Sequence, residues 1–451
     1  MKRLVLIKPV NPWHAWRARR SNGRVPPVAL GILAALTPQD WQVKIIDENF
    51  TPFQYADADL VGLTALTSTA PRAYEIAARY RESGVPTVMG GVHATMLPEE
   101  AGQYVDSVVI GEAEGVWPRV IGDFESGKLG RTYRGGFPDL KDMPIPRYDL
   151  FPRRCLGAIQ TSRGCPMNCE FCAVTTFNGN RYRHRPVEEV LHELEKMPQK
   201  VVFFLDDNIV GHGKENEERA IALFEGMIKR GLNKFWFGQA SMNFAGNQTV
   251  LEYAARSGCL LVMIGVEAEQ PEALREIKKT ANLRALKQSY QEAFRRIHQH
   301  GIAIHGFFMY GMDADTPDSL RRRAEFIRTC GVDSARISII CPFPGTRLYE
   351  RMRQEGRLRY TEFPQDWVHY HFAGVAQQPK LMTPHVLEDL VSEGHRQIHG
   401  VGAVWSRFFR TLRTTRRVPT AVCALLTSLR FRRAELGIID DLRQRQRETV
   451  P

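Results

Sequence analysis

Apolar and polar positions follow a strand-then-helix order through the first 128 residues. Continuous apolar runs predict buried strands, and stretches with apolar residues every three or four positions predict helices between them. The predicted strands cover residues 3–9, 42–48, 59–67, 85–91 and 107–113, and the predicted helices cover residues 26–36, 71–84 and 114–127. Strands that are apolar on both sides favour a parallel sheet covered on both faces. We therefore expect residues 1–128 to form an open, doubly wound, Rossmann-like (flavodoxin-like) α/β domain.

Three loops of this domain are candidates for a ligand site. Ligands of doubly wound domains bind at the carboxyl ends of the strands, where glycine lets them approach the backbone closely. A pair of glycines is a weak signal, however, and can equally form a tight turn. The candidate residues are Thr64, Ala65, Leu66, Thr67, Gly90, Gly91, Val92, His93, Gly111 and Glu112.

A second strand-and-helix alternation follows a linker. Residues 129–157 are rich in Pro, Gly and charge without a sustained period, which predicts the linker. Residues 158–357 then form the second alternation, and their six βα units predict a partial (β/α)6 barrel with its chemistry at the carboxyl ends of the strands. The predicted strands cover residues 157–162, 200–207, 234–241, 260–268, 302–311 and 335–345.

The remaining segment, residues 358–451, is predicted as a C-terminal extension with basic helices. From residue 401 onward it carries eleven arginines against four acidic residues, and so contributes most of the net charge of +11. Pro419 divides it into two predicted helices in which Trp, Phe and Leu alternate with arginine. Such a helix can lie on an anionic membrane surface, and the alternative is a helix packed on the barrel with a solvated basic face. Charges nearly balance elsewhere, so nucleic acid is not expected as a partner.

Composition indicates a cytoplasmic protein. The 451 residues suffice for two or three domains, and no stretch approaches eighteen uninterrupted apolar residues. The basic N-terminus is followed by too few apolar residues for a signal peptide. Eight cysteines in so long a chain do not indicate a disulfide scaffold, and clustered thiols in a reducing compartment usually serve a metal or catalysis. Peripheral contact with the inner face of the membrane is expected only if the basic helices bind lipid.

Three cysteines, Cys165, Cys169 and Cys172, follow the first predicted barrel strand. They are too closely spaced for a disulfide with one spare thiol. A zinc site would need a fourth ligand, for which His184 is the candidate, and three buried structural cysteines are a further alternative. An iron–sulfur cluster normally takes four cysteines, so three would leave one iron open to bind a small molecule.

Cys165, Cys169, Phe171 and Cys172 match the signature of the radical S-adenosylmethionine (SAM) family, which this chain resembles. The resemblance implies a [4Fe–4S] cluster whose open iron chelates the amino and carboxylate groups of SAM. It also implies a reducing electron-donor protein, because electron transfer into the sulfonium releases the 5′-deoxyadenosyl radical. The residues expected to face SAM are Phe171, Asp207, Gln239, Ser241 and Glu267.

Three further residues are weak candidates for a catalytic role. His305 and Tyr310 belong to the fifth predicted barrel strand, where a substrate or proton donor could lie, and Cys341 ends the sixth. The alternative for His305 is a hydrogen-bonded histidine of the core.

The order of a parallel α/β domain, a Pro-rich linker and a barrel resembles the cobalamin-binding subfamily of radical SAM enzymes. The stretches "GLTALT", "GGVHAT" and "VIGEAEG" are similar to its cobalamin-binding loops. The Asp-x-His-x-x-Gly motif, whose histidine ligates cobalt in many cobalamin domains, is absent, so the resemblance implies cobalamin without a protein imidazole below the metal. His14 and Trp16 lie in the loop after the first predicted strand, near where that histidine would be. A cobalt-ligand role for His14 is one hypothesis, and a loop residue that packs on the corrin edge or faces solvent is the alternative.

The resemblance implies a methyltransferase that acts on an unactivated carbon. The adenosyl radical removes a hydrogen atom, and the carbon radical then takes a methyl group from methylcobalamin. We therefore expect methylation of a small-molecule or lipid-like substrate.

Three alternatives remain open. The first is a related enzyme that oxidises or cyclises its substrate without methyl transfer. The second is an RNA-modifying enzyme of the methylthiotransferase type, although such enzymes hold a second cluster in their N-terminal domain and no cysteine precedes Cys155 here. The third, which is not an enzyme, is a zinc-stabilised binding module.

Overall fold

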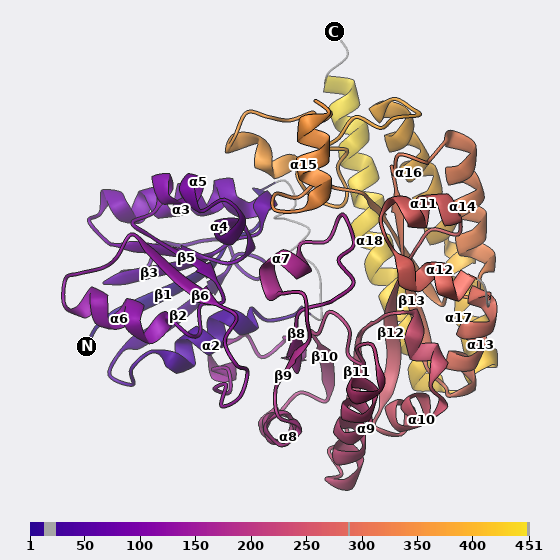
Figure 1. The fold of residues 1–451 in the computed structure, drawn as a ribbon, viewed down its shortest axis with the longest axis horizontal. Helices are drawn as coiled ribbons and strands as arrows, with labels where there is room; N and C mark the ends of the chain where they lie inside the picture. Colours follow the sequence, from indigo (N-terminus) through magenta and orange to yellow (C-terminus); the bar gives the residue numbers. More distant parts are fainter. Residues whose placement is uncertain (13–23, 287–288, 449–451) are drawn as a thin grey trace.

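The computed structural model describes residues 1–12, 24–286 and 289–448, with side chains described as far as residue 437. His14 and Trp16 lie outside the described residues. Figure 1 shows the N-terminal domain in indigo and purple on one side and the barrel in magenta to orange on the other, with the short helix α7 (Val174–Asn178) between them. No helix in the described ranges is long and apolar enough to span a bilayer.

The N-terminal domain contains a six-stranded parallel sheet in the order β2-β1-β3-β4-β5-β6. Its strands are β1 (Arg3–Lys8), β2 (Gln42–Asp47), β3 (Leu60–Thr64), β4 (Thr87–Gly90), β5 (Ser107–Gly111) and β6 (Thr132–Gly136). The order reverses at β1 and β3, as in flavodoxin-like domains, and the predicted fold class is confirmed. Five of the strands were predicted. The sixth, β6, comes from the predicted linker, and only Tyr133 is buried in it, so its sequence does not show the alternation of a strand.

Helices cover both faces of this sheet because neighbouring strand residues point in opposite directions. Leu4 and Leu6 of β1 belong to the core beneath one set of helices, whereas Val5 and Ile7 belong to the core on the other face. The helices of the domain are α2 (Val28–Leu36), η2 (Thr67–Thr69), α3 (Ala70–Glu82), α4 (Val92–Met96), α5 (Pro98–Tyr104) and α6 (Trp117–Glu125). Of the predicted helices, α2, α3 and α6 are present. The helices α4 and α5 are too short to produce a helical period in the sequence.

The second domain is a partial barrel. Its six strands are all parallel and lie in the order β14-β13-β12-β11-β10-β7, which confirms the six predicted strands. They are β7 (Gly157–Ile159), β10 (Val201–Phe204), β11 (Phe235–Ala240), β12 (Cys259–Glu267), β13 (Ala303–Tyr310) and β14 (Ser334–Ile339). A two-stranded antiparallel ladder of β8 (Ser162–Arg163) and β9 (Arg183–His184) follows β7.

One face of the barrel sheet packs against a large core formed with the helices that follow the strands. These helices and the short elements around them are α8 (Val187–Lys196), α9 (Lys214–Lys229), η4 (Met242–Gly246), α10 (Gln248–Arg256), α11 (Pro271–Glu276), α12 (Thr280–Leu286), α13 (Tyr290–Gln299), α14 (Pro317–Thr329) and α15 (Arg347–Gln354). In the linker the only described helix is the single turn η3 (Tyr148–Leu150), where the Tyr148 hydroxyl donates to the Ala158 carbonyl and so joins the linker to β7.

The C-terminal extension packs against the barrel. Its helical elements are η5 (Gln365–His369), α16 (Pro384–His399), α17 (Val401–Thr415) and α18 (Val418–Glu448), and the break at Pro419 is where the sequence predicts it. Ala424 of α18 packs with Leu261 and Ala303, which lie on the sheet face opposite the large core. The helix α18, yellow in Figure 1, therefore covers the inner face of the partial barrel. Of the two alternatives for the basic helices, packing on the barrel applies to α18.

Candidate active site

The three cysteines lie in a loop that β8 and β9 close at its base. The loop begins at Gly164, which has a φ of +91°, and a Cβ at this position would collide with the Arg181 carbonyl oxygen, so only glycine fits. The Cys165 amide donates to the Gly179 carbonyl at 3.1 Å, and the Cys172 amide donates to the Cys169 carbonyl at 3.2 Å. These backbone bonds hold the cysteines in one compact turn at the carboxyl ends of the barrel strands.

The thiols of this loop suit a metal centre. The eight cysteines all belong to the described part of the chain and form no disulfide. Burial raises the pKa of all three loop thiols, that of Cys172 to about 12, and neighbouring thiols add to this for Cys169 and Cys172. Three buried or partly buried thiols that share one loop without bonding to each other are a donor set that becomes deprotonated when it binds metal. The donor set therefore fits the predicted cluster.

The "GVE" sequence of β12 builds a buried ion pair next to this loop. The pairing of β12 with β13 is irregular between Gly265 and Glu267, and Glu267 adopts a left-handed φ of +64°. Its carboxylate accepts a hydrogen bond from Lys279 Nζ at 3.0 Å. A Cβ at Gly265 would overlap the Glu267 carboxylate oxygen, so glycine leaves the space that the ion pair occupies.

Lys279 connects this ion pair to the cysteines. Burial alone would lower the pKa of its ammonium, but the Glu267 carboxylate and the Cys169 and Cys172 thiols together raise it. Its Nζ also lies 5.9 Å from the centre of the Phe171 ring. Lys279 thus places a positive charge beside two metal-ligand candidates and Phe171. Sequence reasoning missed this position, because the second lysine of the pair Lys278–Lys279 matches no motif.

The two adjacent aspartates after β10 differ in their surroundings. Asp206 accepts hydrogen bonds from the Thr161 amide, the Thr161 hydroxyl and the Ser162 hydroxyl, and so holds β7 to β10. Asp207, the predicted residue, has a buried Oδ2 without a hydrogen-bond partner. Burial, and then the Asp206 charge, raise the pKa of Asp207 to about 6. An unsatisfied buried carboxylate oxygen beside Cys165 and Cys172 is what a charged ligand such as the amino group of SAM would satisfy.

Gln239 and Ser241 belong to a polar network at the neighbouring strand ends. The Ser241 hydroxyl donates to Asn243 Oδ1 at 2.5 Å, accepts from Asn208 Nδ2 at 2.8 Å and lies 3.0 Å from His212 Nε2. Gln239 is tied to the loop after β10, because Ile209 donates its amide to the Gln239 carbonyl. The structure therefore brings Asp207, Gln239, Ser241 and Glu267 to one edge of the barrel, as predicted. Their contact with SAM stays a prediction.

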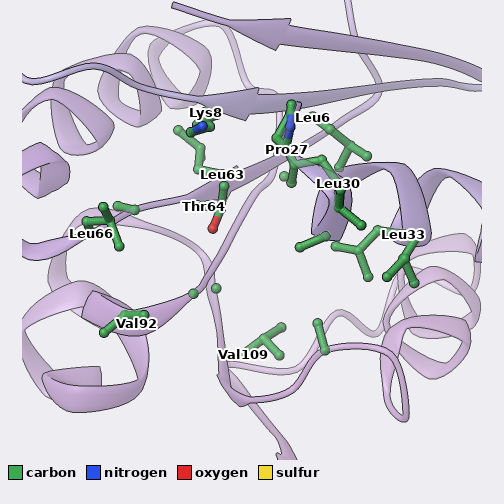
Figure 2. A pocket seen from close by; sticks show the side chains of 18 of the residues that line it. Leu6, Lys8, Pro27, Leu30, Leu33, Leu63, Thr64, Leu66, Val92 and Val109 are labelled. Atoms are coloured by element: carbon green, nitrogen blue, oxygen red, sulfur yellow. The ribbon is translucent and has the colours of Figure 1, made fainter. Parts of the chain in front are cut away.

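A cavity of about 660 Å³ opens at the carboxyl edge of the N-terminal sheet and reaches the barrel. Figure 2 shows its largely hydrocarbon lining, with the Thr64 oxygen and the Lys8 nitrogen among the carbon atoms. On the barrel side it is lined by Gln160, Arg163, Phe177 and Leu205. Of the ten loop residues predicted for this site, the eight that line the cavity are Thr64, Ala65, Leu66, Gly90, Gly91, Val92, Gly111 and Glu112.

The cavity continues as an apolar slot between the sheet and α2. Leu6, Val88 and Val109 of the sheet form one wall, and Leu30 and Leu33 of α2 lie across from them. Gly62 opens this slot, since a Cβ there would lie 2.7 Å from Cδ2 of Leu6 and 3.6 Å from the Trp117 ring. A shallow polar mouth with a deep apolar slot fits cobalamin, which has a broad macrocycle and a flat aromatic base on a tail. Sequence reasoning missed the slot because α2 was predicted only as a covering helix.

Two predicted loop residues do not line the cavity. His93 is fully buried, and its Nε2 lies 2.8 Å from the Tyr74 hydroxyl and 3.2 Å from the Glu100 carboxylate. Thr67 is buried in η2. Because α4 begins at Val92, it turns His93 away from the ligand side. No histidine is found among the described lining residues.

The predicted Glu112 has a role between the domains. Its carboxylate accepts hydrogen bonds from Arg163 and Arg183, which belong to the ladder that closes the cysteine loop. Arg163 also donates to Glu114 at 2.6 Å. Burial alone would raise the pKa of Glu114, but Arg163 lowers it, so the carboxylate stays ionised. Four charges thereby join the edge of the N-terminal domain to the cysteine loop, with Glu112 and Arg163 buried and Glu114 and Arg183 partly buried.

The three weak catalytic candidates lie in packed surroundings. His305 is fully buried on the inner face of β13, where its Nδ1 lies 2.8 Å from Ser334 Oγ and its ring stacks on Phe431 of α18. Burial lowers the pKa of His305 to about 3. Tyr310 faces the large core, where its hydroxyl donates to the Leu320 carbonyl, and Cys341 packs with Trp367 and Tyr370. The strand positions were right, but β13 alternates its side chains into two cores rather than into an open site.

Two family models match the chain, that of the radical SAM superfamily over residues 159–327 and that of the B12 binding domain over residues 17–121. The chain is 32% identical over 403 residues to the bacteriochlorophyllide d C-12(1)-methyltransferase of Chlorobaculum tepidum, covering 84% of each chain. It is 27% identical over 348 residues to the hopanoid C-2 methylase of Rhodopseudomonas palustris, covering 74% of this chain and 65% of that protein. Its fold is similar to that of the radical SAM methyltransferase TsrM from Kitasatospora setae, whose structure was solved with cobalamin and a [4Fe–4S] cluster bound. The TM-score is 0.67 at 16% identity, and the match covers 88% of this chain and 81% of that chain.

We predict that one substitution in the apolar slot removes cobalamin and leaves the iron–sulfur cluster in place. Gly62→Leu fills the space beside Leu6 and Trp117, so we expect the bound cobalt per chain to fall roughly tenfold or more, the equivalent of about 1.4 kcal/mol, with the iron content unchanged. The measurement is iron and cobalt analysis after anaerobic reconstitution. Gly122→Leu is the matched control, because nothing lies within 4 Å of a Cβ there. Equal cobalt in both variants would contradict the assignment of the slot.

We predict that breaking the Glu267–Lys279 ion pair lowers the affinity for SAM. Lys279→Met removes the positive charge beside the cysteines, and we expect SAM to bind roughly tenfold more weakly or worse, as measured by equilibrium dialysis against the reconstituted enzyme. The single variant also leaves a buried carboxylate unpaired, which costs about 3–5 kcal/mol of stability. The double variant Lys279→Met with Glu267→Gln removes that cost and should still bind SAM weakly, whereas Lys279→Arg should bind it well. Unchanged SAM affinity in the double variant would show that the pair only supports the fold.

Proposed function

The chain belongs to the radical SAM enzymes that carry a B12-binding domain, and we propose that it transfers a methyl group to an unactivated carbon of a largely apolar small molecule. The two family matches confirm the predicted cofactors, a [4Fe–4S] cluster, SAM and cobalamin. Both matches lie within the predicted domain bounds, which themselves stay a prediction.

One observation carries the proposal: the carboxyl edges of the two sheets open onto the same cavity. Its lining combines the loops after β3, β4 and β5 with Arg163, Phe177 and Asn178 of the cysteine-loop region. A methyl donor bound on the N-terminal sheet and a radical source bound at the cysteines would therefore face one enclosed space. Methyl transfer to a carbon without a lone pair needs both groups within reach of one substrate.

The residues of this chain would bind, orient and shield the reacting groups. We propose that Cys165, Cys169 and Cys172 ligate the cluster and that Lys279 and Asp207 position the charged groups of SAM. When bound, the cofactors supply the electron, the hydrogen-abstracting group and the methyl group. The apolar wall would limit contact of the bound groups with water, which protects reactive species from side reactions.

The described lining would offer cobalamin no histidine, and cobalamin without a protein imidazole below the cobalt stays a prediction. His14 lies outside the described residues. The reducing electron donor also stays a prediction.

For the substrate class, we propose a molecule with a large apolar body. The related proteins are named for bacteriochlorophyllide d and for hopanoids, a macrocyclic pigment and a polycyclic hydrocarbon. Both are small molecules with extended apolar surfaces, which suits the barrel side of the cavity, where Phe177 and Leu205 border the space outside the slot assigned to cobalamin.

Transfer from labelled SAM tests the proposed function. The reconstituted enzyme is reduced anaerobically with SAM that carries a CD3 group, and chlorin pigments and hopanoids are offered separately. We expect one of them to gain a CD3 group in place of hydrogen, as detected by mass spectrometry, and Cys172→Ala to abolish the transfer. Formation of 5′-deoxyadenosine with a changed but unlabelled product would instead indicate the oxidising or cyclising alternative. Labelling of RNA alone would contradict the substrate class.

We also propose that α17 contacts a membrane surface from which an apolar substrate is taken. Val401, Trp405 and Phe409 are spaced by four residues and so form one stripe, and they are 58%, 48% and 61% exposed. Exposed arginines follow on the same helix end, at Arg413 and Arg416. A helix with aromatic anchors and arginine suits an anionic lipid surface.

Sedimentation with vesicles tests this contact. We expect the full-length protein to pellet with phosphatidylglycerol-containing vesicles and less with phosphatidylcholine alone. Trp405→Ser with Phe409→Ser should weaken vesicle binding about a hundredfold or more, since each buried aromatic contributes about 1.5–3 kcal/mol. The control, Phe235→Ser with Leu381→Ser, removes two exposed apolar side chains outside α17. Equal pelleting of the two double variants would rule out α17 as the contact.

A further inference from the structure

Two histidines and a glutamate meet between α16 and α18, away from the cavity described above. His395 and His399 are four residues apart on α16, so their rings project from the same side of the helix, and their ring centres are 5.8 Å apart. Glu435 of α18 faces them. All three residues are at least 97% buried.

The potential ligand atoms of the three side chains converge. Nε2 of His399 lies 3.0 Å and Nδ1 of His395 lies 2.5 Å from the same oxygen, Oε2 of Glu435. One ligand atom from each residue lies within 4.8 Å of the other two. Donors on a tetrahedral ion with bonds of about 2.1 Å are about 3.4 Å apart, so small shifts would admit an ion at the centre of the three.

Hydrogen bonding within the cluster satisfies only some of these groups. Nε2 of His399 pairs with Oε2 of Glu435, but Nδ1 of His395 approaches this oxygen outside the geometry of a hydrogen bond and has no other hydrogen-bond partner. Buried polar atoms are rarely left unpaired in native proteins, and each such case indicates a missing partner. An ion bound by Oε2 of Glu435 and by the two imidazoles would supply that partner for Nδ1 of His395.

The surrounding cations leave the shared carboxylate oxygen accessible to an ion. Arg336 of β14 lies 3.4 Å from Oε1, on the other oxygen of Glu435. Arg407 donates to the Ile398 carbonyl and Arg432 donates to the His399 carbonyl, so both engage the backbone of α16. Oε2 is thus contacted by the two imidazoles and not by these arginines. Arg336 on Oε1 would hold the carboxylate in one orientation when Oε2 binds an ion.

We propose that His395, His399 and Glu435 form a binding site for one divalent transition-metal ion, with zinc as the expected ion. Two imidazoles and one carboxylate are an established zinc donor set, and a water molecule completes it. The site would fasten α18, which covers the inner face of the barrel, to α16, which packs with the core on the other face. Both helices pack at β14, the edge strand of the sheet, so the ion would close this edge.

Metal analysis of the full-length protein, purified without added cobalamin, tests the site. We expect about one zinc per chain, retained when Cys165, Cys169 and Cys172 are all replaced by alanine and lost in His395→Ala with His399→Ala. His385→Ala is the matched control, because this histidine is exposed on the same helix, and it should retain the zinc. Zinc below a tenth of an equivalent in both the wild-type and the His385→Ala protein, even after incubation with zinc chloride, would overturn the proposal.

A second measurement separates metal binding from a role in folding. After the metal has been stripped from the protein in which Cys165, Cys169 and Cys172 are replaced by alanine, added Co2+ should produce the visible absorption of a tetrahedral site. Adding Glu435→Gln to this triple variant should abolish the absorption while keeping the shape of the side chain. Added Zn2+ should raise the Tm of the stripped triple variant and leave that of the version with Glu435→Gln unchanged. No Co2+ absorption and no change of Tm in the triple variant would identify the cluster as an ion-paired contact only. Neither result bears on methyl transfer, so failure here leaves the proposed function standing.

Discussion

The structure depends on a largely buried ion network where the two domains meet. Glu112 and Glu114 follow the fifth strand of the N-terminal sheet, and Arg163 and Arg183 close the base of the cysteine loop. Removing four charges from water is costly, and such a network is tolerated only when every partner is present. It therefore specifies one relative position of the two sheets. The cavity exists because both carboxyl edges are held facing each other at this point.

The glycines around the site and the irregular strand pairing at Glu267 also determine the shape of the site. Gly164 permits the tight start of the cysteine loop, and Gly265 leaves space for the pair formed by Glu267 and Lys279. Glu267 reaches this placement through a left-handed backbone, a strain that commonly occurs at functional sites. On the other side, Gly62 keeps open a slot that any larger residue would fill. Absent side chains thus shape the site as much as the charged ones do.

Local pattern predicted most of the fold and the motif-bearing part of the site. All six barrel strands and five strands of the first sheet were predicted from apolar runs, and the cysteine spacing identified the family. Features that depend on contacts between distant residues could not be predicted. Lys279 can be recognised as a site residue only from its position next to Glu267 and the cysteines. His93 is turned away from the cavity by a helix that is too short to show a helical period in the sequence. The position of α18 on the inner face of the barrel depends on packing with Leu261 and Ala303, more than a hundred residues earlier.

We propose that the cluster and cobalamin share one cavity between the two domains. The most direct test is the electron paramagnetic resonance spectrum of the enzyme with a reduced cluster and cob(II)alamin both bound. Two spins that face the same cavity interact, so we predict that each signal is broadened or split when the other centre is present. We also predict that Cys172→Ala restores the spectrum of isolated cob(II)alamin. Two unperturbed spectra, superimposed at full occupancy of both sites, would contradict a shared cavity.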